Sequence, residues 1–373
     1  MRMPCNPDLA PYWSWRSRKT SRVILASALF LLMRPVFAQT AAARPDARYD
    51  AVELGGLANK NFSFVRGLNV SGQVAGLSGE SNGTDSRAVL WTPDGVEILG
   101  TLPGGDSSAS TGVNNSGHVV GTSNTATVVR AFLWTKYGGM QDLGTLPGDK
   151  GSEAFHINNV GQVVGSSSGP RGIRAVLWQA NGLVQLLGTL PGGGFSRAVA
   201  INDSGEVIGT SGSSSGTRAF FWTNNGGMRD LGTLPGHTSS EALEINNSGQ
   251  VVGHSSGPGG TRAFLWTRSG GMKDLGTLPG GDYSRALGIN DAGQVVGTST
   301  SFSGARAFLW TAAEGMQDLN ASMPDGVLLA EAYCINGRGQ IAALSGSAEH
   351  ISTVGGHEHE EEHAYRVFLL TPR

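Results

Sequence analysis

Cysteine is almost absent from this chain of 373 residues, which holds only Cys5 and Cys334. Cys5 falls in an N-terminal segment that we expect to be removed, so the mature chain has no pair with which to build a disulfide framework. Cys334 lies inside the apolar stretch AYCIN. We therefore expect a buried structural thiol in preference to a nucleophile.

Charged residues are scarce as well. They make up 15% of the chain and nearly cancel, leaving a formal net charge of -2. This composition excludes a coiled coil and a charge-driven disordered chain. It also gives no electrostatic basis for nucleic acid or an anionic membrane as a partner. Glycine, by contrast, is abundant at 57 residues, which is typical of a turn-rich, all-β protein.

No long hydrophobic run is present. The run VILASALFLLM at 23–33 has eleven residues, whereas a membrane-spanning helix needs about 20. It follows a basic segment and precedes PVFA, which places Val36 and Ala38 before a cleavage site. This order predicts a secretory signal peptide at 1–38, with an uncleaved anchor as the alternative. We expect a secreted, periplasmic or extracellular protein with a linker at 39–48 and no transmembrane segment after signal removal.

A repeat of about 44 residues organises the rest of the chain. The tryptophans that end RAFLW and its relatives recur at an interval of 43 and then of 44 residues. A fixed period of this length is typical of solenoids, propellers and arrays, in which one unit cannot bury its own faces. The tryptophans are Trp91, Trp134, Trp178, Trp222, Trp266 and Trp310.

Each unit contains four short strands, which 241–278 illustrates. EALEIN, QVVGHS, RAFLWT and MKDLGTL, called strands a, b, c and d below, are rich in apolar residues and separated by clusters of Gly, Asn, Ser or Pro. The unit therefore predicts one four-stranded antiparallel sheet. Turns such as INNSG suit the a–b hairpin, because the Asn side chain bonds to nearby backbone and Gly is flexible.

The heptapeptide DLGTLPG occurs at 142–148, 230–236 and 274–280. We expect DLGTL to form the end of strand d and Pro-Gly to form a type II turn, because Pro fixes φ and Gly accepts a positive φ. In strand a we expect Phe155 and Ile157 on a large side and Ala154 on a small side. Large sides of one sheet would then pack on small sides of the next.

Strand d is missing at the end of the chain and present in excess at the beginning. Strands a, b and c occur seven times, whereas YDAVELGGL at 49–57 aligns with strand d and precedes the first strand a. This circular permutation is expected of a closed ring of sheets. The N-terminal strand d would complete the last sheet, so that no edge is left open. We predict an all-β, seven-bladed β-propeller of four-stranded antiparallel blades at 49–373, and a monomer.

The compound motif RAFLWT..GGM.DLGTLPG...SRA..IN..GQVVG.S resembles the HAF-repeat family of extracellular repeat proteins. The resemblance covers 51–373 and implies secretion and repeat architecture, but no activity and no site. The chain departs from the family at the first position of its His-Ala-Phe triplet. Arginine replaces histidine there, as Arg87, Arg130, Arg174, Arg218, Arg262 and Arg306.

These arginines, with Arg366 in the last unit, allow two interpretations. They could form a ring of ligand-binding cations. Their presence in every unit favours a structural role, in which they bond to carbonyl groups or to an acid of strand d, because a single site needs an asymmetric set of residues. The acids are Asp142, Asp230, Asp274, Asp318 and Glu53, and Ile98 and Leu186 take the same position in two units.

Positions at which the repeat is broken are the candidate binding residues. The d–a and b–c loops of antiparallel blades open on one face, called the loop face below, and the d–a loops differ between units. Aromatic and acidic side chains on one surface suit a sugar or peptide, although unrelated solvated loop tips would give the same pattern. The candidates are Asp106, Asp149, Lys150, Phe195, His237, Asp282 and Tyr283, with Asp325 in the last unit.

The largest break is a His- and Glu-rich insertion at 346–363, between strands b and c of the last unit. Imidazoles near carboxylates suit Zn, Cu or Ni, and His-x-His places two rings on one side of an extended segment. A charged, solvated loop is the alternative. The candidate ligands of a weakly bound divalent metal are His350, His357, His359 and His363, and no other cofactor is expected.

Two functions remain open. A noncatalytic scaffold would bind a glycan, a peptide or an envelope component on the loop face, whereas a hydrolase or lyase would have its site at the mouth of a central channel. The sequence has no nucleophile elbow, HExxH motif or phosphate-binding loop. His156 and Glu244 share a strand-a position that is Gly, Ala or Cys elsewhere, and they form the best channel-facing pair. We assign no catalytic residue and expect the binding scaffold.

Overall fold

The computed structural model describes residues 48–57, 62–80, 85–323, 327–345 and 366–373. The chain divides into two compact units, Met1–Phe37 and Ala38–Arg373. The first unit lies outside the described residues, and so does the predicted signal peptide. No helix of the described part is long and apolar enough to cross a membrane.

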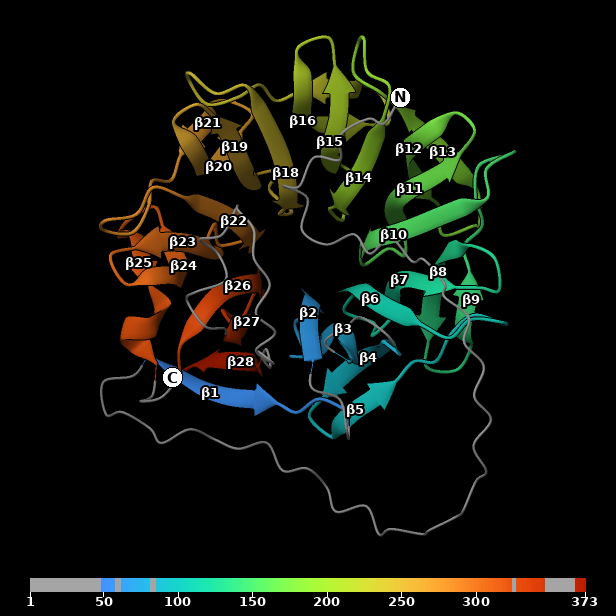
Figure 1. Ribbon diagram of the computed structural model, residues 1–373, viewed down its shortest axis with the longest axis horizontal. Helices are drawn as coiled ribbons and strands as arrows, with labels where there is room; N and C mark the ends of the chain where they lie inside the picture. Colours follow the sequence, from blue (N-terminus) through green and yellow to red (C-terminus); the bar gives the residue numbers. More distant parts are fainter. Residues whose placement is uncertain (1–47, 58–61, 81–84, 324–326, 346–365) are drawn as a thin grey trace, which may run out of the picture. The chain divides into compact units, whose positions relative to one another are not determined.

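The second unit is a seven-bladed β-propeller, as predicted (Figure 1). Each blade is a four-stranded antiparallel sheet in which strand a is innermost and strand d outermost. Neighbouring blades contact one another in chain order, and blade 7 contacts blade 1, so the ring is closed. One short 3-10 helix, η1 (Leu319–Ser322), follows blade 6.

The strands of blades 1 to 4 are β2 (Phe62–Leu68), β3 (Val74–Gly79), β4 (Arg87–Thr92) and β5 (Gly95–Ile98); β6 (Ser108–Val113), β7 (Val119–Asn124), β8 (Val129–Thr135) and β9 (Gly139–Asp142); β10 (Gly151–Ile157), β11 (Val163–Gly169), β12 (Gly172–Trp178) and β13 (Val184–Gly188); and β14 (Ser196–Ile201), β15 (Val207–Ser213), β16 (Gly216–Thr223) and β17 (Gly227–Asp230). Those of blades 5 to 7 are β18 (Ser239–Ile245), β19 (Val251–Gly257), β20 (Gly260–Thr267) and β21 (Gly271–Asp274); β22 (Ser284–Ile289), β23 (Val295–Ser301), β24 (Gly304–Thr311) and β25 (Gly315–Asp318); and β26 (Leu329–Ile335), β27 (Ile341–Ser345), β28 (Arg366–Pro372) and β1 (Tyr49–Leu54).

Strand β1 closes the ring. It pairs antiparallel with β28 from Tyr49 opposite Pro372 to Leu54 opposite Val367. Two ion pairs reinforce the ladder, because Arg366 binds Glu53 and the Arg373 guanidinium lies 2.8 Å from Asp50. The leading strand d of the sequence is therefore the fourth strand of blade 7, and this prediction is confirmed.

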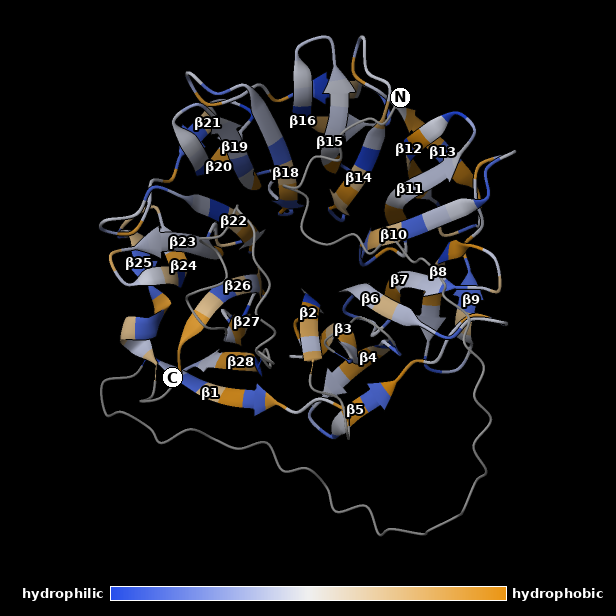
Figure 2. Cartoon of the chain, in the orientation of Figure 1, coloured by the Kyte–Doolittle hydropathy of each residue, from blue (hydrophilic) through white to orange (hydrophobic). Residues whose placement is uncertain are grey.

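Hydrophobic clusters lie between the blades. One cluster joins Ala200, Ile208 and Phe221 of blade 4 to Phe264 and Trp266 of blade 5. The six repeat tryptophans are all buried, with exposed fractions of 1–6%. Hydrophilic residues instead occupy the short outer strands, such as β9 and β25 (Figure 2). Each blade thus buries its faces only against its neighbours, as the repeat predicts.

The heptapeptide connects one blade to the next, and its strand ends earlier than expected. In blade 4 strand β17 stops at Asp230, and Gly232 then bends the chain with a φ of +78°. Leu234 is buried between blades, and its N–H donates to the Ser255 hydroxyl at 3.1 Å. The prediction that DLGTL is part of strand d is therefore wrong, because the chain must leave the outer edge to reach the next inner strand.

The expected type II turn is confirmed. Gly236 has a φ of +80°, and the His237 N–H donates to the Leu234 carbonyl oxygen at 3.0 Å. This is the hydrogen bond across a four-residue turn with Pro and Gly at its centre.

A β-bulge interrupts every inner strand and changes the faces that we expected. In blade 3 the register shifts between Ala154 and His156, so Phe155 is the extra residue. Ala154 and Ile157 consequently lie in the same cluster, whereas Phe155 is only partly buried. The assignment of Ile157 and Ala154 to opposite sides is wrong, because simple alternation does not continue through a bulge.

Candidate functional site

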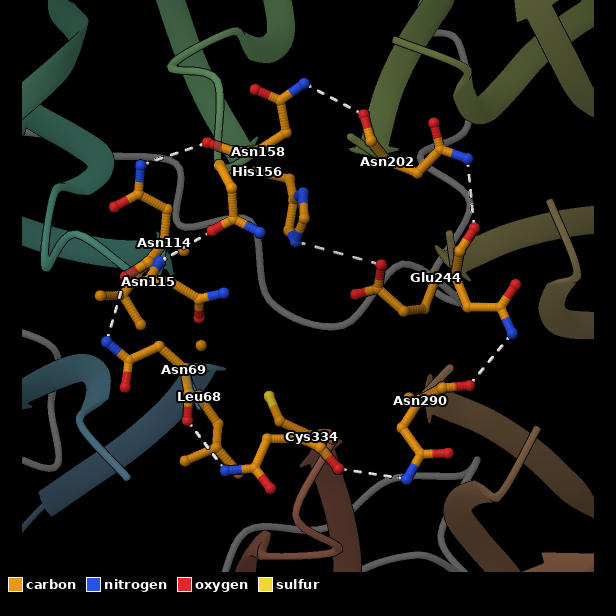
Figure 3. A pocket seen from close by; sticks show the side chains of 18 of the residues that line it. Leu68, Asn69, Asn114, Asn115, His156, Asn158, Asn202, Glu244, Asn290 and Cys334 are labelled. Carbon is orange, nitrogen blue, oxygen red and sulfur yellow. Dashed lines mark hydrogen bonds and ion pairs between the residues drawn. The ribbon is translucent and has the colours of Figure 1, made fainter. Parts of the chain in front are cut away.

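A ring of seven asparagines surrounds the axis of the propeller at the end of the inner strands. Each Asn donates its side-chain Nδ2–H to the carbonyl oxygen of the equivalent Asn in the next blade, at 2.9–3.2 Å, and Asn336 of blade 7 donates to Asn69 of blade 1 (Figure 3). The members are Asn69, Asn114, Asn158, Asn202, Asn246, Asn290 and Asn336.

The same asparagines hold the a–b turns. In blade 4 the Oδ1 atom of Asn202 accepts the backbone N–H groups of Ser204 and Glu206, at 3.1 and 3.0 Å. Gly205 completes the turn with a φ of +75°. The predicted Asn–backbone bonding is confirmed, but sequence reasoning missed the bond between blades. The sequence signal for this bond was that all seven turns have Asn at this position. Asp would also serve in an Asx turn, but it has no side-chain N–H to donate to the next blade.

A central pocket of about 190 Å³ lies on the face that carries these a–b turns. The end of every inner strand and the turn after it contribute to its wall. The pocket is therefore on the opposite face from the d–a and b–c loops. Six of its lining residues occupy the strand-a position directly after the bulge, which differs between blades, namely Gly67, Gly112, His156, Glu244, Gly288 and Cys334.

His156 and Glu244 point toward one another across this pocket, although they belong to blades 3 and 5 (Figure 3). The His156 Nε2 and Glu244 Oε1 atoms are 4.0 Å apart, and both side chains remain partly exposed. Burial raises the pKa of Glu244, while His156 and the Ile245 N–H act in the opposite direction. The predicted direction of the pair is thus confirmed, and the pocket holds a carboxyl group that is easier to protonate than a free one.

Cys334 also lines the pocket, from blade 7. Its thiol donates to the Arg66 carbonyl oxygen at 3.2 Å. Burial, together with the nearby Glu244 carboxylate, raises the pKa of Cys334 to about 12 against an opposing effect of Arg66. The thiol is therefore protonated at neutral pH and is no nucleophile. It faces the polar pocket, however, as well as the hydrophobic cluster in which we expected it.

The recurring arginines have the structural role that their repetition predicts. Arg130 contacts Asp142 of its own strand d, with 3.0 Å from Nε to Oδ2. In the two blades that lack this acid, Arg87 binds Asp85 and Arg174 binds Asp149. Most of the series also donates to a backbone carbonyl, as Arg130 does to Lys150 at 2.9 Å.

The loop-face candidates lie on a common side, in loops that contact one or both of the blades they connect, as Lys150 does with Arg130 of blade 2 and Ser168 of blade 3. The shared side follows from contacts between d–a and b–c loops, such as the bond from Arg171 to the Pro147 carbonyl at 3.2 Å. Asp149 is buried, with a side chain 1% exposed. Burial raises its pKa, but hydrogen bonds from Ser167 and Arg174 outweigh this effect and lower it. Asp149 therefore serves the fold.

The other loop-face candidates are more accessible. Asp106 exchanges hydrogen bonds with Asn124, and Asp282 does so with Thr300. The Tyr283 N–H also donates to Thr300, at 3.0 Å. Phe195 packs on Gly212 with its ring 38% exposed, His237 packs on Gly257, and Lys150 is exposed. These contacts do not join the candidates into one site, so ligand binding at these residues stays a prediction.

The predicted metal ligands His350, His357, His359 and His363 lie outside the described residues, as does Asp325. Within the described ranges, no group of three or more His, Cys, Asp or Glu side chains could hold a metal ion. The metal prediction is therefore untested.

Comparison with known proteins supports the fold alone. No family model and no curated protein matches the chain, so the HAF-repeat resemblance is not confirmed. Oligogalacturonate lyase from Vibrio parahaemolyticus is similar in structure, with a TM-score of 0.56, 10% identity, and coverage of 91% of this chain and 97% of that one. Virginiamycin B lyase from Staphylococcus aureus has a TM-score of 0.53, 14% identity, and coverage of 87% and 99%. The class that these findings define is the seven-bladed β-propeller.

Proposed function

We propose that the protein is a secreted, noncatalytic scaffold that binds a glycan, a peptide or an envelope component, and that the central pocket receives the ligand. The observation that carries this proposal is that residues from every blade meet in one pocket. All seven blades contribute to one pocket, and His156, Glu244 and Cys334 make its wall asymmetric. Asymmetric positions in a repeat protein are where a single function is expected. The loop face, where the described contacts do not join the candidates into one site, is the alternative location.

The size of the pocket limits what it can hold. Its volume of about 190 Å³ lies below the roughly 300–1,000 Å³ of pockets that enclose a whole drug-sized molecule. The wall carries amide, carboxyl and imidazole groups. The pocket therefore suits one polar end group of a larger glycan or peptide.

A binding screen with matched variants tests this function. Purified protein would be presented with glycans, peptides and envelope fractions, and any ligand retained would be measured against two double variants. His156→Ala with Glu244→Gln alters the pocket, and Lys150→Ala with Phe195→Ala alters the loop face. We expect at least tenfold weaker binding for the pocket variant only. Loss only in the loop-face variant would move the site to that face, and no retained ligand would contradict the scaffold.

The pair His156 and Glu244 also favours a second candidate, a hydrolase or lyase at the channel mouth. Their 4.0 Å separation brings two proton-transferring groups into one pocket, and the raised pKa of Glu244 is a property of general acids. Incubation of each retained ligand with the protein, followed by mass spectrometry, separates the two. A product whose formation needs His156 would establish the enzyme, and an unchanged ligand would support the scaffold.

We also propose that the insertion at 346–363 binds a divalent metal weakly. Strands β27 and β28 pair over five residue pairs on either side of it, from Ile341 opposite Leu370 to Ser345 opposite Arg366. Deletion of 347–361 should therefore leave folding intact while it removes the retention of Zn or Ni. Metal retention by the deleted protein would contradict this proposal.

A further inference from the structure

Among the described residues that line the central pocket, Arg66 is the one cation. It is the extra residue of the β-bulge in β2, between Val65 and Gly67. The equivalent bulge residues of the other blades do not line the pocket, and only Arg66 among them is charged; they are Thr111, Phe155, Val199, Leu243, Leu287 and Tyr333. The charge is therefore specific to blade 1.

Two aromatic rings support the Arg66 guanidinium. Its Cζ atom lies 4.7 Å from the ring centre of Phe64 and 5.5 Å from that of Tyr333. The two rings pack edge to face at 4.8 Å. Stacking of this kind orients the plane of a guanidinium, and Arg66 remains exposed. Among the described residues no carboxylate forms an ion pair with Arg66, whereas six of the seven recurring strand-c arginines have a carboxylate partner.

The rim of the pocket is also incomplete beside Arg66. From blade 1 to blade 5, the residue after each ring Asn donates its N–H to an Asn or Asp side chain of the next blade, as Asp203 does to Asn247 at 3.0 Å. Gly337 occupies this position in blade 7 and Val70 in blade 1, so the chain of bonds stops. In the described part of the chain, no acceptor takes the N–H of Asp291 or Gly337.

We propose that the central pocket recognises a carboxylate on its ligand, and that Arg66 receives this group. The proposal rests on the pocket as the binding site and names the chemical class of the end group. A stacked guanidinium presents two parallel N–H donors that match the two oxygens of a planar carboxylate. The backbone N–H groups of Asp291 and Gly337 at the rim can donate to the same carboxylate from the side of blades 6 and 7.

A dianion fits this pocket less well. Asp203, Asp291 and Glu244 line it together with a single arginine, and the described wall has no lysine. One positive charge can balance a monoanion, whereas a phosphate group carries up to two negative charges beside these carboxyl groups. An acidic sugar and the C-terminal carboxylate of a peptide present the same monoanionic group, and they are the two sources to separate.

Calorimetric titration with two matched pairs of probes makes this separation. One pair is D-glucuronate and D-glucose, and the other is acetyl-dialanine as its free acid and as its amide. We expect one acid to bind at least tenfold more tightly than its neutral partner. Arg66→Gln should weaken that acid by about 10- to 100-fold, because a charge-assisted pair is lost. Arg66→Lys, which keeps the charge but not the fork, should lose an intermediate amount.

Arg268→Gln is the matched control. Arg268 also stacks on an aromatic ring, 5.0 Å from the centre of Phe221, but it pairs with Glu206 and does not line the pocket. This variant should bind like the wild type, and all variants should keep the wild-type melting transition. The proposal is overturned if Arg66→Gln binds the acid unchanged, if neutral probes bind as tightly as the acids, or if inorganic phosphate binds and neither acid does. Absence of binding at millimolar acid also overturns it. If a neutral ligand binds the wild type and not the His156/Glu244 double variant, the proposed binding function is still supported. Only the proposal that the ligand carries a carboxylate is then wrong.

Discussion

Glu244 shows the cost of a polar residue at the axis of the propeller. Its pKa is raised because of burial, so the folded state holds the proton more tightly than the unfolded chain. This contribution to stability is therefore fully present at a pH below the unfolded pKa, which is near the ordinary value of 4.5, and is lost as the pH rises through the folded pKa.

Glu244→Gln should accordingly raise the urea midpoint at pH 7 and leave it nearly unchanged at pH 4. Gln keeps the size of the side chain and removes the buried charge. Glu97→Gln, on the exposed outer strand β5, controls for the loss of one negative charge. A lower midpoint for Glu244→Gln at pH 7 would mean that the carboxylate stabilises the fold. It would contradict the view that burial of this charge lowers the stability of the protein.

The repeat tryptophans act at the same scale through packing. Trp222 is 5% exposed and belongs to the cluster between blades 3 and 4. Trp222→Ala should lower the free energy of unfolding by about 3–5 kcal/mol, as for other buried aromatic residues. Tyr137→Ala is the control, because Tyr137 is 98% exposed. Equal midpoints for the two variants would place Trp222 outside the core.

At the scale of the strand, the bulge demands a glycine on the neighbouring strand. A methyl group on Gly209 of β15 would overlap the Arg197 carbonyl oxygen of β14. Gly209→Ala should therefore destabilise the protein by about 1–3 kcal/mol, as overpacking does. Gly194→Ala is the matched control, since a methyl group there meets no atom within 4 Å. Chemical denaturation of both variants checks this, and a stable Gly209→Ala protein would show that the bulge can relax.

The strands and turns could be predicted from the sequence because their signals are local. Asn and Gly mark each a–b turn, Pro-Gly marks each blade connection, and the period gives the number of blades. The bulges could not be predicted in this way, because the register of a strand depends on its partner. For the same reason Ile157 was assigned to the wrong face.

The site was predictable only in part. His156 and Glu244 stand out when the units are aligned, but their 4.0 Å approach depends on seven-fold geometry that no single unit contains. Arg66 is the only charged residue at its position in the seven repeats, but the sequence does not mark that position as a bulge. The loop-face candidates were chosen for variability, and Asp149 shows the weakness of that criterion, since it replaces the missing strand-d partner of Arg174.

At the scale of the whole molecule, closure depends on one strand and its ion pair. The hydrogen bond from Arg366 lowers the pKa of Glu53, despite an opposing effect of burial. A lowered pKa gives stability that is present above the unfolded pKa and is lost as the pH falls through the folded pKa. Because both side chains are partly exposed, the pair should contribute less than about 1 kcal/mol.

Glu53→Gln should therefore lower the thermal midpoint slightly at pH 7, and this effect should shrink as the pH falls through the folded pKa and the wild-type carboxyl becomes protonated. Glu314→Gln is the control, because Glu314 lies 3.9 Å from Arg48 with both side chains largely exposed. A pH-independent effect of Glu53→Gln would show that shape, and not the ion pair, matters at the closure.

The closed ring brings seven strand ends to one pocket, and amide hydrogen exchange can locate the ligand there directly. Exchange would be measured with and without the ligand that the binding screen retains. Binding in the pocket predicts slower exchange in the inner-strand ends and a–b turns of several blades at once, at 66–73, 156–162 and 244–250, with 147–151 and 191–196 unchanged. Slower exchange confined to 147–151, 191–196 and 281–283 would contradict it and place the ligand on the loop face.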